Sequence, residues 1–107
     1  MRVNKGILLL LIWMCQLVAF AQTDKSKAAY FILEGHRQML LGNNSDAFEM
    51  LRHGLQLDPT SSVAQSELSH FWQYLRQDSL SLEYMKQASQ NDPNNYWNKE
   101  ALVDFYV

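Results

Sequence analysis

The chain has 107 residues, enough for one domain at most, and its formal net charge is −2 at neutral pH. Hydrophobic residues make up 48% of the chain and charged residues 19%, which excludes an intrinsically disordered protein. The sequence has no basic run that would suit a phosphate backbone, so we expect no nucleic-acid partner.

Residues 1–21 have the parts of a secretory signal peptide: a basic start, an apolar centre and small residues around a cleavage site. Residues 7–20 are almost entirely apolar, and Ala19-Phe20-Ala21 follows the small-x-small cleavage pattern. An apolar stretch of about 14 residues is short for a membrane span, which needs roughly 20. We therefore expect cleavage between Ala21 and Gln22 and export of residues 22–107, with an uncleaved membrane anchor as the alternative.

Cys15 is the single cysteine of the chain. Trp13 and Met14, directly before it, are too bulky for a lipoprotein signal, so we expect no lipid on this residue. After cleavage the chain has no cysteine and needs no disulfide chemistry in an oxidising compartment. Its net charge becomes −4, because the signal carries two of the nine basic residues.

Five helices are expected, because the chain has only four glycines and two prolines to interrupt them. Their predicted ranges are about 26–41, 45–57, 62–75, 79–91 and 96–106. Two apolar stripes at helical spacing support the second and third of these ranges. The stripes are Ala47, Leu51, Gly54 and Leu55, and then Leu68, Phe71, Trp72 and Leu75.

Gly and Asn at residues 42–44 suit the left-handed end of the first helix. Asp58-Pro59 and Asp92-Pro93 should end the second and fourth helices, because a residue before proline avoids the α region. Polar side chains are expected to cap the second and fourth helices. The candidate caps are Asn44 or Ser45 for the second helix, and Asp78 or Ser79 for the fourth.

The sequence repeats with a period of 34 residues, the separation of its two prolines. Sliding the chain by this period aligns identical residues: His36/His70, Leu41/Leu75, Ser45/Ser79, Glu49/Glu83, Gln56/Gln90, Asp58/Asp92 and Pro59/Pro93. Leu68/Leu102 and Phe71/Phe105 extend the register into a third copy. The copies cover about residues 28–61, 62–95 and, in part, 96–107.

With each proline at position 32 of its copy, the sequence resembles the tetratricopeptide repeat family. The matching small positions 8, 20 and 27 hold Gly35 and Ser69, Ala47 and Ser81, and Gly54 and Ala88. The large apolar position 24 holds Leu51 and Met85. Position 4, usually Trp, departs from the family with Phe31, Gln65 and Lys99, and position 7, usually Leu, departs with Glu34.

The resemblance implies an all-α fold, an antiparallel helix-pair solenoid of about two and a half repeats after the signal peptide. It also implies a concave groove that binds a peptide or a helix. The groove residues expected from the family's positions are Ile32, His36, Met39, Leu40, Ser66, His70, Gln73, Tyr74, Trp97, Glu100 and Asp104. The alternative is that Met39, Leu40 and Tyr74 only pack on neighbouring helices. None of these positions holds the Lys, Arg or Asn with which some relatives clamp a terminal carboxylate.

The last predicted helix carries several apolar residues, namely Leu102, Val103, Phe105, Tyr106 and Val107. Solenoids usually end with a helix whose outer face is polar. We therefore expect some of these side chains to cover the second repeat and the others to be left for a partner, a second copy or further repeats. On this interpretation the chain is the N-terminal piece of a longer array.

Three histidines prompt the question of a metal site. His36 and His70 occupy equivalent positions in successive copies, so their helices should lie about 10 Å apart. A single ion holds its His ligands at about 2 Å, and His53 falls on a different face, so we expect no metal and no other cofactor. No Gly-rich phosphate loop and no G-x-S-x-G motif occurs in the sequence, and we expect no enzymatic activity.

The sequence therefore favours an exported, non-enzymatic scaffold that binds a protein or peptide partner. Residues 30–35 (YFILEG) and 94–97 (NNYW) resemble exported tetratricopeptide proteins of Gram-negative bacteria, which implies the periplasm or cell envelope. The alternative is a sensory or docking segment at the front of a longer signalling or enzymatic chain. Membrane contact is expected only through an uncleaved signal.

Overall fold

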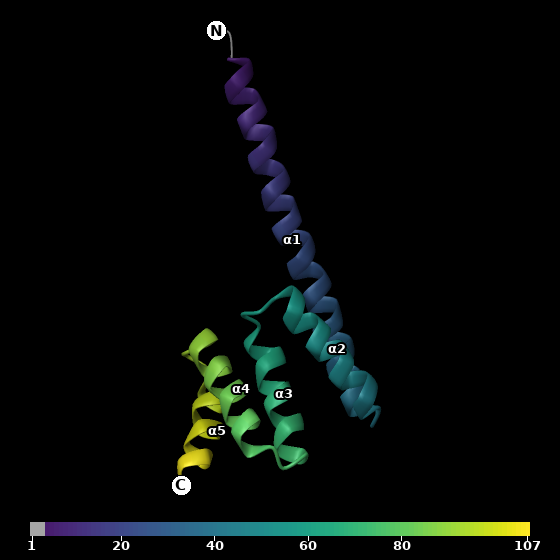
Figure 1. Cartoon of the computed structure of the whole chain (residues 1–107), viewed down its shortest axis with the longest axis vertical. Coiled ribbons are helices and arrows are strands. Elements are labelled where there is room, and N and C mark those ends of the chain that lie inside the picture. Colours follow the sequence, from purple (N-terminus) through teal and green to yellow (C-terminus); the bar gives the residue numbers. More distant parts are fainter. Residues whose placement is uncertain (1–3) are drawn as a thin grey trace.

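The computed structural model describes residues 4–107, with the backbone alone for residues 17–23. It consists of five helices and has no strand within the described part of the chain. The helices are α1 (Lys5–Leu40), α2 (Asn44–Leu57), α3 (Ser62–Tyr74), α4 (Asp78–Asn91) and α5 (Tyr96–Tyr106). Helix α1 pairs with α2 and α3 pairs with α4, while α5 lies against α4 (Figure 1). The fold is an all-α, antiparallel helix-pair solenoid of two pairs and one further helix.

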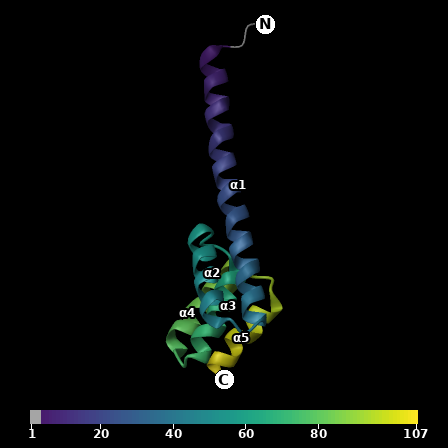
Figure 2. The same cartoon turned by 90° about the vertical axis from the view of Figure 1, so that its right-hand side faces the viewer.

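The bounds of α2, α3, α4 and α5 confirm the predicted ranges to within one residue. The predicted start of the first helix near residue 26 is wrong, because α1 begins at Lys5. No glycine or proline occurs between Gly6 and Gly35 to end a helix there, so the helical backbone continues through the apolar segment. Residues 4–16 are exposed, and this part of α1 stands clear of the other helices (Figure 2).

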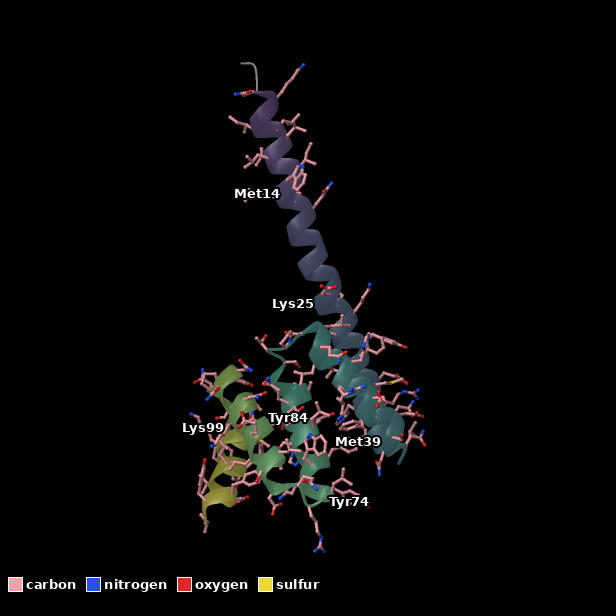
Figure 3. The ribbon with its side chains drawn as sticks, in the orientation of Figure 1. Met14, Lys25, Met39, Tyr74, Tyr84 and Lys99 are labelled. Carbon is pink, nitrogen blue, oxygen red and sulfur yellow. The ribbon has the colours of Figure 1, made fainter. Side chains whose placement is uncertain are left out.

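Met14 lies on the protruding part of α1, and Lys25 lies where α1 meets the other helices (Figure 3). The expected cleavage site, Ala19-Phe20-Ala21, belongs to the stretch whose side chains the structure does not describe. A search of the described residues finds no helix with the length and apolarity needed to cross a membrane.

The first helix of each pair ends in the same way, one repeat apart. Gly42 has φ 81° and Arg76 has φ 60°, so both lie in the left-handed region. The next residue closes a Schellman motif, with Asn43 N donating to Gln38 O at 2.9 Å and Gln77 N donating to Trp72 O at 2.8 Å. Gly42 confirms the predicted left-handed helix end, and Arg76 repeats it without a glycine.

The predicted side-chain caps of α2 and α4 are wrong. The N-cap residues are Asn43 and Gln77, one residue before the expected candidates, and neither side chain makes a capping bond. The Schellman motif leads directly into the next helix, and Asn43 Nδ2 instead donates back to Gln38 Oε1 at 2.7 Å. Side-chain caps occur on the other helices of the repeats, at Ser61 for α3 and Asn95 for α5.

Helices α1 and α2 approach each other through two glycines. A Cβ on Gly35 would lie 2.8 Å from Leu51 Cγ, and a Cβ on Gly54 would lie 2.7 Å from Ile32 Cγ1. Both distances are shorter than a carbon–carbon contact allows. Each glycine therefore receives a large side chain of the partner helix, which only a position without a Cβ allows at this distance.

Helices α3 and α4 approach through two serines at positions equivalent to Gly35 and to Ala47. Ser69 Oγ donates to Ser81 O at 2.7 Å, and Ser81 Oγ donates to Ser69 O at 2.8 Å. Both serines are fully buried. The pair is thus joined by reciprocal hydrogen bonds, which satisfy the two buried hydroxyl groups.

Gln65 stands where the family usually has tryptophan, and it is buried. Its Nε2 donates to Pro59 O at 2.9 Å, and its Oε1 accepts from Asn91 Nδ2 at 2.9 Å. This side chain therefore ties the loop between α2 and α3 to the end of α4. These two hydrogen bonds satisfy the Gln65 amide, which would otherwise be a buried polar group without a partner.

The predicted apolar stripes contribute part of the core. Ala47, Leu51 and Gly54 of α2 are buried with Leu68 of α3, as the periodicity predicts. Leu75 is exposed instead, because α3 has already ended at Tyr74 and the chain turns away. The buried part of the α3 stripe therefore ends before Leu75.

Helix α5 covers the second repeat only in part. Leu102 and Phe105 are half-buried, whereas Val103, Tyr106 and Val107 are exposed. This division matches the expectation for the last helix.

The left-handed backbone at Arg76 makes a stability prediction. The Arg76→Gly substitution should raise the free energy of unfolding by about 0.5–1 kcal/mol, because it removes the Cβ strain of a positive φ. Arg52→Gly, in the exposed middle of α2, is the control and should lower the same quantity by about 1 kcal/mol. Urea denaturation followed by circular dichroism measures both. A loss of stability in Arg76→Gly would contradict the repeated helix end.

The serine contact between α3 and α4 makes a second prediction. Ser69→Val should lower the free energy of unfolding by about 2 kcal/mol or more, because a methyl group would replace an oxygen that sits 2.7 Å from Ser81 O. Ser69→Ala is the matched control, and it should lose only about 1 kcal/mol, the contribution of one hydrogen bond. Equal stability of the two variants in urea denaturation would show that the helices do not approach closely here.

Candidate functional site

Three hollows lie between the first helices of successive repeats, which are α1, α3 and α5. The first lies between α1 and α3 and has a volume of about 460 Å³. Apolar side chains of both helices form much of its wall, and charged groups stand around them. The lining residues are Lys25, Ala29, Ile32, Leu33, His36, Asp58, Ser61, Val63 and Glu67.

The second hollow lies between α3 and α5 and has a volume of about 180 Å³. Its lining residues are Ser62, Val63, Ser66, Glu67, Asn95, Trp97 and Asn98. Val63 and Glu67 line both this hollow and the first one, so the two are neighbours on either side of α3. A third hollow of about 140 Å³ lies further along α3 and α5, lined by His70, Gln73, Met85, Ala101, Asp104 and Phe105.

Glu67 and His36 link the two repeats across the first hollow. Glu67 Oε1 pairs with His36 Nδ1, and the Glu67 side chain is only 13% exposed. The second oxygen, Oε2, is buried and finds no hydrogen-bond donor among the residues that the structure describes. Because a carboxylate has two strong acceptors, this pair leaves half of its bonding capacity unused.

Seven of the eleven groove residues expected from the sequence line these three hollows. They are Ile32 and His36 in the first, Ser66 and Trp97 in the second, and His70, Gln73 and Asp104 in the third. Met39, Leu40 and Glu100 line none of the three hollows in the described structure. The structure thus brings the majority together along α3 and leaves these three outside.

Tyr74 lies elsewhere, near the end of α3 that is far from Lys25 (Figure 3). It lines a separate hollow of about 360 Å³ between the start of α2 and the end of α3. The aromatic residues of this hollow include Phe48 and Trp72, whose ring centroids are 5.7 Å apart in an edge-on contact. Tyr74 is exposed and does not pack into the core, so the alternative that it only supports a neighbouring helix does not describe it.

Glu34, at the position where the family has leucine, belongs to the surface of α1 rather than to the hollows. It accepts hydrogen bonds from Arg37, with Nη2 at 2.7 Å from Oε1, and from Gln38. The bond from Arg37 and then that from Gln38 hold the pKa of Glu34 below its ordinary value. The same pairing raises the pKa of Arg37.

No protein-family model matches this chain, and no curated protein matches it. The site must therefore be judged on its own geometry. Among the side chains that the structure describes, no group of three His, Cys, Asp or Glu residues is placed to hold a metal ion.

Sequence reasoning missed Glu67 and Lys25 as lining residues of the groove. The family's groove positions are defined by side chains that point straight into the concave face, and Glu67 falls one position after such a site. Its spacing of four residues from Val63 places both on one side of α3, and that signal was present in the sequence.

Proposed function

We propose that this chain is an exported scaffold of the tetratricopeptide type, which holds a peptide or helix of another protein in the groove beside α3 and performs no catalysis. Its place would be the periplasm or cell envelope of a Gram-negative bacterium. The observation that carries the peptide-binding role is the row of hollows along α1, α3 and α5, two of which share Val63 and Glu67.

The buried positions support assignment to this family. Every small or large position named by the resemblance is buried in both full repeats: Gly35, Ser69, Ala47, Ser81, Leu51, Met85, Gly54 and Ala88. The helix ends also repeat at the same spacing, at Gly42 and Arg76 and at Asp58 and Asp92. Burial and backbone geometry therefore repeat with the same 34-residue period as the sequence.

The shape and chemistry of the groove support a peptide as its occupant. The first hollow has an apolar wall that can bury an apolar side chain, and the second has hydroxyl and amide groups that can bond to a backbone. Recognition of an extended or helical segment commonly combines such apolar anchors with a few polar contacts.

A substitution in the middle of the groove should weaken binding. Val63→Asp introduces a charge into the apolar wall of the first hollow and should weaken binding of a groove peptide by roughly tenfold or more, because it makes apolar contact with the ligand unfavourable. The measurement is fluorescence anisotropy of peptides selected from a random display library on the full chain in a nonionic detergent.

Leu80→Asp is the matched control for this experiment. Val63 and Leu80 are exposed to 56% and 42%, and each lies in the first turn of its helix, where an acidic residue is tolerated. Leu80 lines none of the three groove hollows of the described structure, so its substitution should leave peptide binding unchanged. Equal binding by both variants, or selection of no peptide at all, would refute the proposed role of the groove.

Export makes a separate prediction. Expression of the full chain in a Gram-negative host should yield a periplasmic product that begins at Gln22, as determined by intact mass and N-terminal sequencing. Residues 4–16 are exposed and the buried residues of the described chain begin at Ala28, so the product should remain helical by circular dichroism. A cytoplasmic product that retains Met1 would contradict export.

A further inference from the structure

We infer that Glu67 selects a basic residue: the groove takes a peptide that places a Lys or Arg side chain between Glu67 and Trp97, and an apolar side chain in the first hollow. This selectivity rests on the peptide-binding function proposed above and gives the ligand a stated chemistry.

Glu67 holds the central place in the groove. It lines both the α1–α3 hollow and the α3–α5 hollow, and Val63 is the other residue that does so. Its Oε1 is engaged by His36, whereas its buried Oε2 has no donor in the described part of the chain. A buried acceptor without a partner costs free energy, and a carboxylate costs more than a neutral group. An ammonium or guanidinium group would supply charge-assisted hydrogen bonds to this carboxylate.

The second hollow has the character of a cation site. Glu67 is the one charged residue among its lining side chains in the described structure, and its charge is negative. Trp97 lines the same hollow and is 74% exposed, so its indole face is available to a ligand. A cation between a carboxylate and an indole gains both the ion pair and the attraction of the aromatic ring. Ser66 adds a hydroxyl acceptor at the same place.

The first hollow suits the apolar neighbour in the peptide. Ala29, Ile32 and Leu33 of α1 face Val63 of α3 across it. Lys25 and Asp58 both line this hollow, and their opposite charges offset each other. Lys99, on α5, does not line the second hollow and lies at the outer edge of the molecule (Figure 3). The apolar wall of the α1–α3 hollow therefore suits the apolar side chain, and the carboxylate and indole of the α3–α5 hollow suit the basic side chain.

The test is selection of a random-peptide display library on the full chain in a nonionic detergent, followed by anisotropy with the enriched peptides. We expect Lys or Arg at one fixed position beside an apolar residue. Replacement of that residue in the peptide by norleucine or citrulline should weaken binding to the unaltered protein by roughly tenfold or more. Glu67→Gln and, independently, Trp97→Ala should each reduce affinity for the basic peptide. Glu83→Gln, an exposed Glu-to-Gln change on α4, should not.

The outcomes separate this inference from the broader proposal. Enriched peptides that lose binding to Val63→Asp but show no preference for Lys or Arg would overturn the basic-residue selectivity and leave the groove as a peptide site. Unchanged affinity on replacing the basic residue by citrulline would overturn it in the same way. Enrichment of no peptide, or of peptides indifferent to Val63→Asp, would overturn both. The peptide replacements need no variant protein, so misfolding of Glu67→Gln would not obscure the result.

Discussion

The close approach of the two helices within each pair is the constraint on which the rest of the structure depends. Helices α1 and α2 meet where Gly35 admits Leu51 and Gly54 admits Ile32. Helices α3 and α4 meet through Ser69, which is equivalent to Gly35, and through the Ser81 hydroxyl of the facing helix, at the position equivalent to Ala47. One pair uses the absence of a side chain and the other uses two small hydroxyl groups that satisfy each other. Different residues therefore solve one steric problem at one spacing, because close-packed interiors tolerate little extra volume.

The two helices within a repeat pack tightly, whereas neighbouring repeats pack more loosely against each other on the side of the groove. Helices α1 and α3 pack loosely on each other, and a hollow of about 460 Å³ lies between them. The pairing of His36 with Glu67 crosses this space and links the first repeat to the second. The Ile32 side chain contributes both to the pairing within the first repeat and to the groove, since it packs on Gly54 and also lines the hollow. The groove is thus a consequence of how the pairs stack.

The period of 34 residues predicted most of the fold, because it sets where the chain turns and where the helices pack against each other. Four helix ranges and all the close-approach positions follow from it. Helix α1 could not be bounded from the repeat, since nothing in residues 7–34 interrupts a helix and only the signal-like composition marked a division. Arg76 could not be identified as left-handed either, because its side chain gives no such preference and the Schellman bond from Gln77 to Trp72 imposes the backbone. Tertiary hydrogen bonds likewise decide the role of Gln65.

The groove residues could be predicted from the sequence only where the family's positions mark them. Glu67, at the centre of the groove, shows why the other residues could not. A carboxylate on a helix is ordinarily a solvated group, and sequence spacing alone gives no reason to bury it. Here burial results from the neighbouring repeat, which brings His36 against one oxygen and leaves the other enclosed. An oxygen enclosed without a donor costs free energy, which an apolar residue at this position would avoid. Under the proposed selectivity, a basic peptide would supply the donor that this carboxylate lacks and a neutral peptide would not.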